Sequence, residues 1–249
     1  MTMDIGELRA RADEFGQTLW ETKLALRPEG EWYPYGTLAN FQHLDTMLTG
    51  PHRDLLELAG GEPLVDIGAA DGDATWFLQS LGYDVDIVDN GPTNFNGLRG
   101  ARLLRDHFGA AVDIFEVDLD SQFRLPRERY GLALFLGTLY HLQNPFYALR
   151  QLANSARYAV ISTRVAQMAA GGGVRFAELP VAYLLGPREC NNDASNYWIF
   201  SVTGLQRLLD RTGWDVLDFV TVGHTTDSDP SSADRDERAF CLIRSRHSR

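Results

Sequence analysis

One short stretch of the chain, residues 65–73, combines an apolar run with aspartates and glycines. Glycine lets a backbone turn tightly and approach a ligand without a Cβ in the way. Ala70 stands where the Gly-x-Gly-x-x-Gly dinucleotide fingerprint needs its second glycine, so a pyrophosphate loop is not indicated. The pattern Asp-x-Gly-x-x-x-Gly instead fits a turn under a zwitterionic ligand without a pyrophosphate, where an acidic residue near the ligand's ammonium group is useful. The predicted contacts are Asp66, Gly68, Ala69, Asp71 and Gly72.

Three further groups of candidate residues stand where later predicted strands end. Asp89 follows the glycine turn by roughly twenty residues, the spacing at which an acid accepts hydrogen bonds from ribose hydroxyls. Asp118 is placed to accept from an amino group of a purine ring, on which Leu119 would pack. Because parallel strands present their carboxyl ends at one edge, we expect these groups to share a site. The candidates are Asp89, Asn90, Asp118, Leu119, Gly137, Tyr140 and His141.

The elements that must position these residues alternate between strand and helix, which indicates a parallel sheet. Apolar runs predict strands at residues 63–68, 84–89, 112–117, 132–136 and 159–163. Helical spacing of apolar residues predicts helices at residues 4–26, 51–59, 74–81, 98–108, 145–156 and 202–211. Two last strands are predicted at residues 214–222 and 239–244. We therefore expect an α/β, Rossmann-like sheet of seven strands, mostly parallel, with an antiparallel final strand.

The chain of 249 residues has the length of one large α/β domain. We divide it into an N-terminal helical cap (1–59), a cofactor-binding core (60–165), an insertion after the fifth strand (166–200) and a C-terminal part (201–249). The N-terminal helices and the insertion are expected to form a cap on the side of the strand ends.

Composition and charge exclude several kinds of function. The formal net charge of −11 disfavours tight binding to a phosphate backbone, which needs clustered positive charge. Lys23 is the only lysine, so a Gly-x-x-x-x-Gly-Lys phosphate loop is absent. Cys190 and Cys241 make no disulfide framework, and no cluster has metal-ligand spacing, so we expect no metal. With no bilayer-spanning run and no apolar signal core in residues 1–11, we expect a cytoplasmic monomer or homodimer.

Three strings of residues carry a resemblance to a known group of enzymes. Residues 136–141 read Leu-Gly-Thr-Leu-Tyr-His, residues 196–200 read Asn-Tyr-Trp-Ile-Phe, and residues 238–240 read Arg-Ala-Phe. Together with the glycine turn they resemble the class I S-adenosylmethionine-dependent methyltransferases. Within that class they are similar to the tRNA wobble-uridine methyltransferase and carboxymethyltransferase family and its small-molecule relatives. The resemblance covers roughly residues 60–165 and, more weakly, 195–245.

The resemblance implies S-adenosylmethionine as cofactor, S-adenosylhomocysteine as product, and an O, N or C acceptor on a small molecule. It also implies alternatives. A carboxymethylating member holds the extra carboxylate of carboxy-S-adenosylmethionine with a tyrosine and an arginine at the places of Tyr140 and Arg238. That member also uses a lysine ahead of its core, and residues 26–35 here have none. A tRNA acceptor is a second alternative, although the basic N-terminal part of the tRNA enzyme has no counterpart. A regulatory protein that binds the cofactor without turnover is a third.

Methyl transfer from a sulfonium is an in-line displacement, in which placing the acceptor matters most. A general base helps only if the acceptor loses a proton, and His141, beside Tyr140, is the first candidate. A structural histidine bonded to backbone is the alternative for His141. For Trp32, Tyr33 and Tyr35 the alternative is a hydrophobic staple between the cap and the core. For the polar segment of the insertion the alternative is an ordered surface loop. The candidates for contact with the acceptor are Trp32, Tyr33, Tyr35, Arg188, Asn192, Asn196, Tyr197, Trp198 and Arg238.

Overall fold

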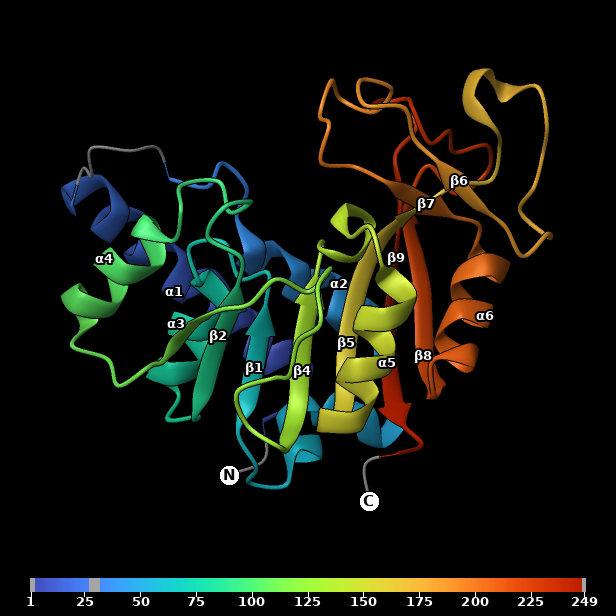
Figure 1. The fold of residues 1–249 in the computed structure, drawn as a ribbon. Coiled ribbons are helices and arrows are strands. Elements are labelled where there is room, and N and C mark those ends of the chain that lie inside the picture. Colours follow the sequence, from blue (N-terminus) through green and yellow to red (C-terminus); the bar gives the residue numbers. More distant parts are fainter. Residues whose placement is uncertain (1–2, 27–31, 248–249) are drawn as a thin grey trace.

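The computed structural model describes residues 3–26 and 32–247. Their strands form one mixed sheet, in which β3, β2, β1, β4 and β5 lie parallel in that order (Figure 1). Next to β5 lies β9, antiparallel to it, and β8 follows β9. The strands are β1 (Leu64–Ile67), β2 (Val85–Asp89), β3 (Ile114–Glu116), β4 (Tyr130–Leu136), β5 (Ala156–Val165), β6 (Ala182–Leu184), β7 (Trp198–Phe200), β8 (Trp214–Gly223) and β9 (Glu237–Ser245).

The central strands are apolar on both faces because helices cover the sheet on both sides. The residues of β4 are buried up to its last position, and β4 lies between β1 and β5. Leu64 of β1 pairs with Val85 of β2 on one side and with Leu132 of β4 on the other. The strand order therefore reverses between β1 and β4, and open α/β sheets bind ligands beyond the carboxyl ends of strands at such a point.

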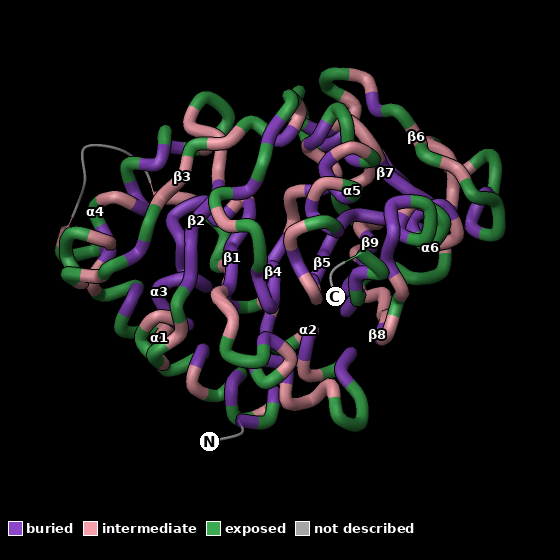
Figure 2. Tube along the Cα trace, turned by 60° about the horizontal axis from the view of Figure 1, so that its bottom comes forward, coloured by how far each residue is buried: buried purple, intermediate pink, exposed green. Residues whose placement is uncertain are grey.

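The helices divide into two layers. One core cluster joins α1 to α4 to one face of the sheet, and a second joins α5 and α6 to the other face. Figure 2 shows buried strands in the middle of the molecule and exposed outer surfaces on the helices. The helices are α1 (Ile5–Leu26), α2 (Asn40–Met47), α3 (Asp73–Ser80), α4 (Arg99–Phe108), α5 (Pro145–Ser155) and α6 (Val202–Arg211). Short 3-10 helices are η1 (Thr37–Ala39), η2 (Gly50–Arg53), η3 (Leu55–Ala59), η4 (Leu139–His141) and η5 (Ala170–Gly172).

The fold class is confirmed, and the sheet is larger than expected. The seven predicted strands are present, with β9 antiparallel as predicted. The described residues form nine strands, because the insertion adds the hairpin of β6 and β7, which pairs with the end of β5. Helix α6 has the predicted bounds, and the side chain of Ser201 caps it by accepting from the Gly204 N–H at 2.8 Å.

Two predictions about the N-terminal part are wrong. Residues 51–59 do not form an α-helix but fall in η2 and η3, which are separated by Asp54 with the non-helical angles φ −86° and ψ 56°. Helix α2 is an unpredicted element. Both α1 and α2 pack against one face of the sheet and do not cap the strand ends. The hairpin of the insertion does lie at that end, above β5 in Figure 1.

Candidate functional site

The turn between β1 and α3 requires glycine at two positions. Gly68 has φ +68°, and a Cβ there would lie 2.2 Å from Oγ1 of Thr138, which follows β4. Gly72 has φ +81°, and a Cβ there would lie 2.8 Å from Cδ1 of Ile87 on β2. Between them, Ala70 has a φ of 56°, which is uncommon for a residue with a side chain. The glycines therefore let the turn lie directly against the ends of its two neighbouring strands.

Asp89 ends β2 and holds the glycine turn in place. Its Oδ2 accepts hydrogen bonds from the Ala70 N–H (3.0 Å) and the Asn94 side-chain amide (2.9 Å). Its Oδ1 accepts from the Asn90 N–H (2.7 Å). Burial raises the pKa of Asp89, and the three hydrogen bonds oppose that rise. An ionised carboxylate has about four acceptor positions, so Asp89 keeps capacity for a ligand hydroxyl.

Carboxylates gather around this turn, and they are Asp66, Asp71, Asp73 and Asp89. Asp66 on β1 is buried and accepts from Oγ1 of Thr75 on α3 at 2.9 Å. Burial raises the pKa of Asp66 to about 7, the Thr75 hydrogen bond opposes the rise, and the charges of Asp89 and Asp73 add to it. Burial also raises the pKa of Asp73, against the effect of Lys23. A positively charged ligand would therefore relieve the repulsion within this cluster.

The carboxylate of Asp71 is bound within the protein. It is 1% exposed, and its Oδ2 accepts from Lys23 Nζ (3.1 Å) and the Tyr33 N–H (2.8 Å). Its Oδ1 accepts from the side-chain amide of Asn96 at 2.7 Å. These three donors tie the turn to the N-terminal part of the chain, and contact of the Asp71 carboxylate with a ligand ammonium stays a prediction.

His141 lies in η4, just beyond β4, and contacts the insertion. Its Nδ1 is 3.1 Å from the backbone oxygen of Ser195 and 3.1 Å from the Ser195 hydroxyl, which in turn donates to Asp193 at 2.7 Å. A carbonyl oxygen only accepts, so this contact assigns the proton of the neutral ring to Nδ1 and leaves Nε2 as the basic nitrogen. Burial lowers the pKa of His141, and the Ser195 carbonyl and the Asp193 charge oppose the shift. The ring is therefore suited to accept a proton at neutral pH.

Arg238 lies at the start of β9, near the same strand ends. Its guanidinium carbon is 5.8 Å from the ring centroid of Tyr140, and its Nη1 is 3.4 Å from where a Cβ on Gly137 would be. Within residues 3–26 and 32–247, no hydrogen bond or ion pair engages the Arg238 guanidinium. Burial, followed by the neighbouring Tyr140 and Tyr35, raises the pKa of Tyr33 to about 12, and Arg238 opposes the rise. Tyr33, Tyr140 and Arg238 thus form one wall of the site, in which the Tyr33 phenol stays protonated.

The insertion is fastened to the segment after β4. The Tyr197 N–H donates to the backbone carbonyl oxygen of Tyr140 at 2.9 Å. The Trp198 Nε1–H donates to the backbone carbonyl oxygen of Gln143 at 3.2 Å. Asn196, predicted to face the acceptor, is buried, and its amide reaches the Cys190 and Asp193 carbonyls at 3.4 Å each. That placement corrects its predicted role to a structural one. Arg188 and Asn192 are exposed on the same insertion, and their contact with an acceptor stays a prediction.

The aromatic residues of the N-terminal part separate into two groups. Trp32 points to α1, where its Nε1–H donates to the Lys23 oxygen at 2.9 Å, as a staple between this segment and the helix would. Tyr33 and Tyr35 face each other with ring centroids 5.5 Å apart, and Tyr35 is 70% exposed. Trp32 thus faces α1, its contact with an acceptor stays a prediction, and Tyr33 lies in the site.

The strand end at β3 differs in detail from the prediction. The strand stops at Glu116, so Asp118 lies in the following loop, exposed, with Oδ1 accepting from the Asp120 N–H at 3.0 Å. Leu119 is buried within the core cluster of α5 and α6. Contact of either residue with a purine ring stays a prediction.

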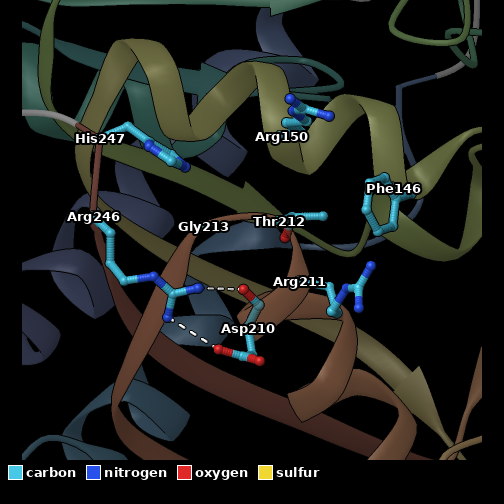
Figure 3. A pocket seen from close by; sticks show the side chains of 8 residues that line it. All are labelled: Phe146, Arg150, Asp210, Arg211, Thr212, Gly213, Arg246 and His247. Atoms are coloured by element: carbon cyan, nitrogen blue, oxygen red, sulfur yellow. Dashed lines mark hydrogen bonds and ion pairs between the residues drawn. The ribbon is translucent and has the colours of Figure 1, made fainter.

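A cavity of about 360 Å³ lies away from the strand ends. It is bounded by α5, the end of α6 and the residues after β9 (Figure 3). Arg246 on its wall pairs with Asp210 at 3.1 Å, and Arg150 and Arg211 project from the two helices. None of the residues predicted for the site lines this cavity, so we assign it no part in the chemistry.

Sequence reasoning missed the residues that support the site from behind. They are Lys23, Thr75, Asn94, Asn96 and Ser195. Their partners lie on other elements, so residue type alone gave no signal. The described residues contain no group of His, Cys, Asp and Glu that could hold a metal ion. Among those residues, no helix is long and apolar enough to cross a membrane.

The strand order with its antiparallel β9 is a fold also found in solved structures of methyltransferases and of proteins with S-adenosylhomocysteine bound. No family model and no curated protein matches the sequence. The likeness is to solved structures. The N-terminal domain of EvdMO1 with S-adenosylhomocysteine bound is 17% identical, with 98% of each chain covered and a TM-score of 0.58. The 1,6-didemethyltoxoflavin-N1-methyltransferase of Burkholderia thailandensis is 20% identical, with 77% of this chain and 75% of that chain covered and a TM-score of 0.50.

A third solved structure with this fold is the [4+2]-cyclase SpnF. It is 16% identical, with 87% of this chain and 86% of that chain covered and a TM-score of 0.53. The same architecture therefore occurs in a protein named for a different reaction, and the activity of this chain has to be argued from its own residues.

Proposed function

We propose that the protein is an S-adenosylmethionine-dependent methyltransferase that acts on an O, N or C atom of a small molecule. The observation that carries the proposal is the acidic glycine turn, where four aspartates gather and Lys23 pairs with only two of them, Asp71 and Asp73. The sulfonium and ammonium groups of S-adenosylmethionine would bring positive charge to this cluster. A dinucleotide would bring a pyrophosphate with two negative charges, which the same cluster would repel.

The residues present fit that cofactor. Gly68 and Gly72 keep the turn free of side chains, and Asp89 retains acceptor capacity for a ribose hydroxyl. When bound, S-adenosylmethionine would supply an electrophilic methyl group. The chain would contribute orientation of the acceptor by Tyr33 and Arg238, and removal of its proton at Nε2 of His141 where it has one to lose.

A small acceptor is favoured over a tRNA for two reasons. The net charge of −11 opposes a polyanionic partner. In addition, the toxoflavin methyltransferase was solved with 1,6-didemethyltoxoflavin, and the EvdMO1 domain was solved in the presence of D-fucose. These support a flat heterocycle or a sugar as the first acceptors to try.

One observation favours a second candidate, carboxymethyl transfer. Arg238 beside Tyr140 is a cation whose guanidinium has no partner in the described residues, so it has room for the extra carboxylate of carboxy-S-adenosylmethionine. The two candidates differ in what Arg238 holds, namely an acceptor group or a cofactor group.

Native mass spectrometry of the freshly purified protein, followed by calorimetric titration with S-adenosylhomocysteine, tests the proposal. A retained mass of S-adenosylmethionine or S-adenosylhomocysteine, or measurable binding, supports it, and formation of S-adenosylhomocysteine with an acceptor panel establishes transfer. A retained carboxylated cofactor would favour the second candidate. A protein that neither retains nor binds these molecules would refute both. Binding without turnover on any acceptor would leave the regulatory alternative.

A further inference from the structure

The only lysine of the chain is buried at the glycine turn. Lys23, near the end of α1, is 5% exposed, and its Nζ lies 3.1 Å from Asp71 Oδ2 and 2.7 Å from Asp73 Oδ1. All three side chains are at most 9% exposed. Removing one partner from a buried ion pair leaves an uncompensated charge, so this contact strongly disfavours any movement that separates α1 from the turn.

The same contact extends to the segment that carries Tyr33. Asp71 Oδ2, which meets Lys23, also accepts from the Tyr33 N–H at 2.8 Å. Trp32, next to Tyr33, contacts Lys23 directly. Its Nε1–H donates to the Lys23 backbone oxygen at 2.9 Å, and its ring centroid lies 5.4 Å from Lys23 Nζ. Residues 32 and 33 are therefore held from both sides by Lys23 and Asp71.

Tyr33 connects this arrangement to the candidate site. Its side chain is partly buried beside Tyr140, and Arg238 and Asp89 are close enough to influence its ionisation. Asp71 Oδ1 also accepts from Asn96, in the loop that follows β2, where Asn94 binds Asp89. A movement of Asp71 would thus disturb both Tyr33, on the wall of the site, and Asp89, the residue predicted to bind the ribose.

We propose that Lys23 is a positioning residue that couples cofactor binding at the glycine turn to closure of residues 32–35 against the site. The inference rests on the proposed function. Opening of the segment breaks the hydrogen bonds from the Tyr33 N–H to Asp71 and from Trp32 to the Lys23 backbone oxygen, and removes the Trp32 ring from Lys23 Nζ. A ligand seated on the turn fixes Asp71, keeps the ion pair intact and holds Tyr33 in place. In this role Lys23 contacts neither the cofactor nor the methyl acceptor, and it acts only through Asp71 and Asp73.

Because Lys23 is the only lysine, its amine is a native probe of this opening. We would treat the wild-type protein with N-hydroxysuccinimidyl acetate and follow acetylation of Lys23 by peptide mass spectrometry, with and without S-adenosylhomocysteine. The rate in urea-unfolded protein gives the reference for a free amine. A ligand at a hundredfold excess over its Kd reduces the population of an open, non-binding state by about a hundredfold. We expect acetylation to slow by at least tenfold in the complex.

Variants test the direction of the coupling. Asp71→Asn should speed acetylation of Lys23 in the free protein by about tenfold, whereas Asp106→Asn, an exposed carboxylate on α4, should leave it unchanged. Lys23→Met should weaken S-adenosylhomocysteine binding by tenfold or more, and Lys23→Arg should restore part of the loss because it returns the positive charge. Circular dichroism identifies variants that do not fold, and the wild-type measurement does not depend on them.

The outcomes separate this inference from the proposed function. Calorimetry on the same wild-type sample reports whether S-adenosylhomocysteine binds. Binding together with slower acetylation supports the coupling. Binding with an unchanged acetylation rate overturns the coupling and leaves the methyltransferase proposal standing. Absence of binding refutes the proposed function, and the inference with it.

Discussion

The backbone N–H of Ala70 donates a hydrogen bond of 3.0 Å to the carboxylate of Asp89, and so joins the turn after β1 to the end of β2. Ala70 reaches this donor position in a left-handed conformation, φ 56°, which a residue with a side chain seldom adopts. The second donor to the same oxygen, the Asn94 amide, comes from the loop that follows β2. Asp89 is therefore oriented before any ligand arrives, which favours binding because less ordering remains to be done.

Replacing Asp89 should weaken cofactor binding without unfolding the protein. We expect Asp89→Ala to reduce the affinity for S-adenosylhomocysteine by roughly 1–3 kcal/mol, the scale of a lost partner at a buried polar group. Isothermal calorimetry measures the change, and Asp106→Ala, an exposed carboxylate on α4, serves as the matched control. Equal affinities in wild type and Asp89→Ala would show that Asp89 is not the ribose acid.

Asp66 should make the stability of the free protein depend on pH. Its pKa rises from 3.8 to about 7 on folding, chiefly through burial. Between these values the folded state holds a proton that the unfolded state has released, so stability falls as pH rises towards 7. We expect Asp66→Asn to abolish this loss, because the amide oxygen still accepts from Thr75.

Urea unfolding at pH 5 and pH 8 measures the effect of that substitution. The free energy of unfolding of Asp66→Asn minus that of wild type should increase from pH 5 to pH 8, by up to about 3 kcal/mol at 1.4 kcal/mol per pKa unit. A difference that is the same at both pH values would mean that Asp66 has an ordinary pKa. Asp106→Asn, at an exposed position, should show no such dependence.

The alternation of strands and helices was predictable because apolar runs and helical spacing are local properties. The hairpin of β6 and β7 was not, since each strand has only three residues, which is too short for a periodic signal. Helix α2 was missed, although Phe41, Leu44 and Met47 recur at helical spacing. The interruption between η2 and η3 at Asp54 depends on the backbone conformation of one residue, which residue types do not predict.

In the candidate site, too, some residues were predictable from the sequence and others were not. Asp89, Gly68 and Tyr140 were predictable because strand ends meet at one edge. The pairing of Lys23 with Asp71 was not, because the two residues are 48 positions apart and a lysine in an amphipathic helix ordinarily faces water. Asn196 was assigned to the acceptor from the resemblance of residues 196–200 to a family segment, and its burial with hydrogen bonds to the Cys190 and Asp193 carbonyls indicates a structural role.

His141 should be needed for transfer to acceptors that lose a proton and not for cofactor binding. We expect His141→Gln to lower kcat by about 10²–10⁴-fold with such an acceptor, the range for loss of a general base, and to leave S-adenosylhomocysteine affinity unchanged. Ser195→Ala is the matched control, because the backbone oxygen that holds Nδ1 is retained. An unaltered kcat in His141→Gln would leave His141 with only the structural role.

The pH dependence of the wild-type rate gives an independent check on His141. Its pKa is lowered from 6.5, mainly by burial, so the basic form persists below the usual imidazole range. With a proton-losing acceptor, kcat should stay level down to pH 6.5 and fall only at lower pH. A decline that begins well above pH 6.5 would assign the titration to another group.

Arg238 should govern the acceptor and not the cofactor. Its guanidinium lies 5.8 Å from the Tyr140 ring, with no ion-pair partner among residues 3–26 and 32–247. An acceptor with a carboxylate or other anionic group would gain a charge-assisted hydrogen bond there, worth about 1.5–3 kcal/mol. We expect Arg238→Met to raise KM for such an acceptor by roughly 10–100-fold, as steady-state kinetics would show. Arg244→Met, on the same strand but paired with Asp215, is the control.

Two further measurements on Arg238→Met separate the acceptor role from the cofactor role. An uncharged acceptor should be methylated equally well by wild type and variant, because it offers nothing for the guanidinium to bind. Calorimetry should give the same affinity for S-adenosylmethionine in both proteins. If instead the variant loses affinity for carboxy-S-adenosylmethionine alone, Arg238 holds the extra carboxylate, and the chain is a carboxymethyltransferase. Equal KM values for an anionic acceptor in wild type and variant, together with equal affinities for carboxy-S-adenosylmethionine, would exclude both roles.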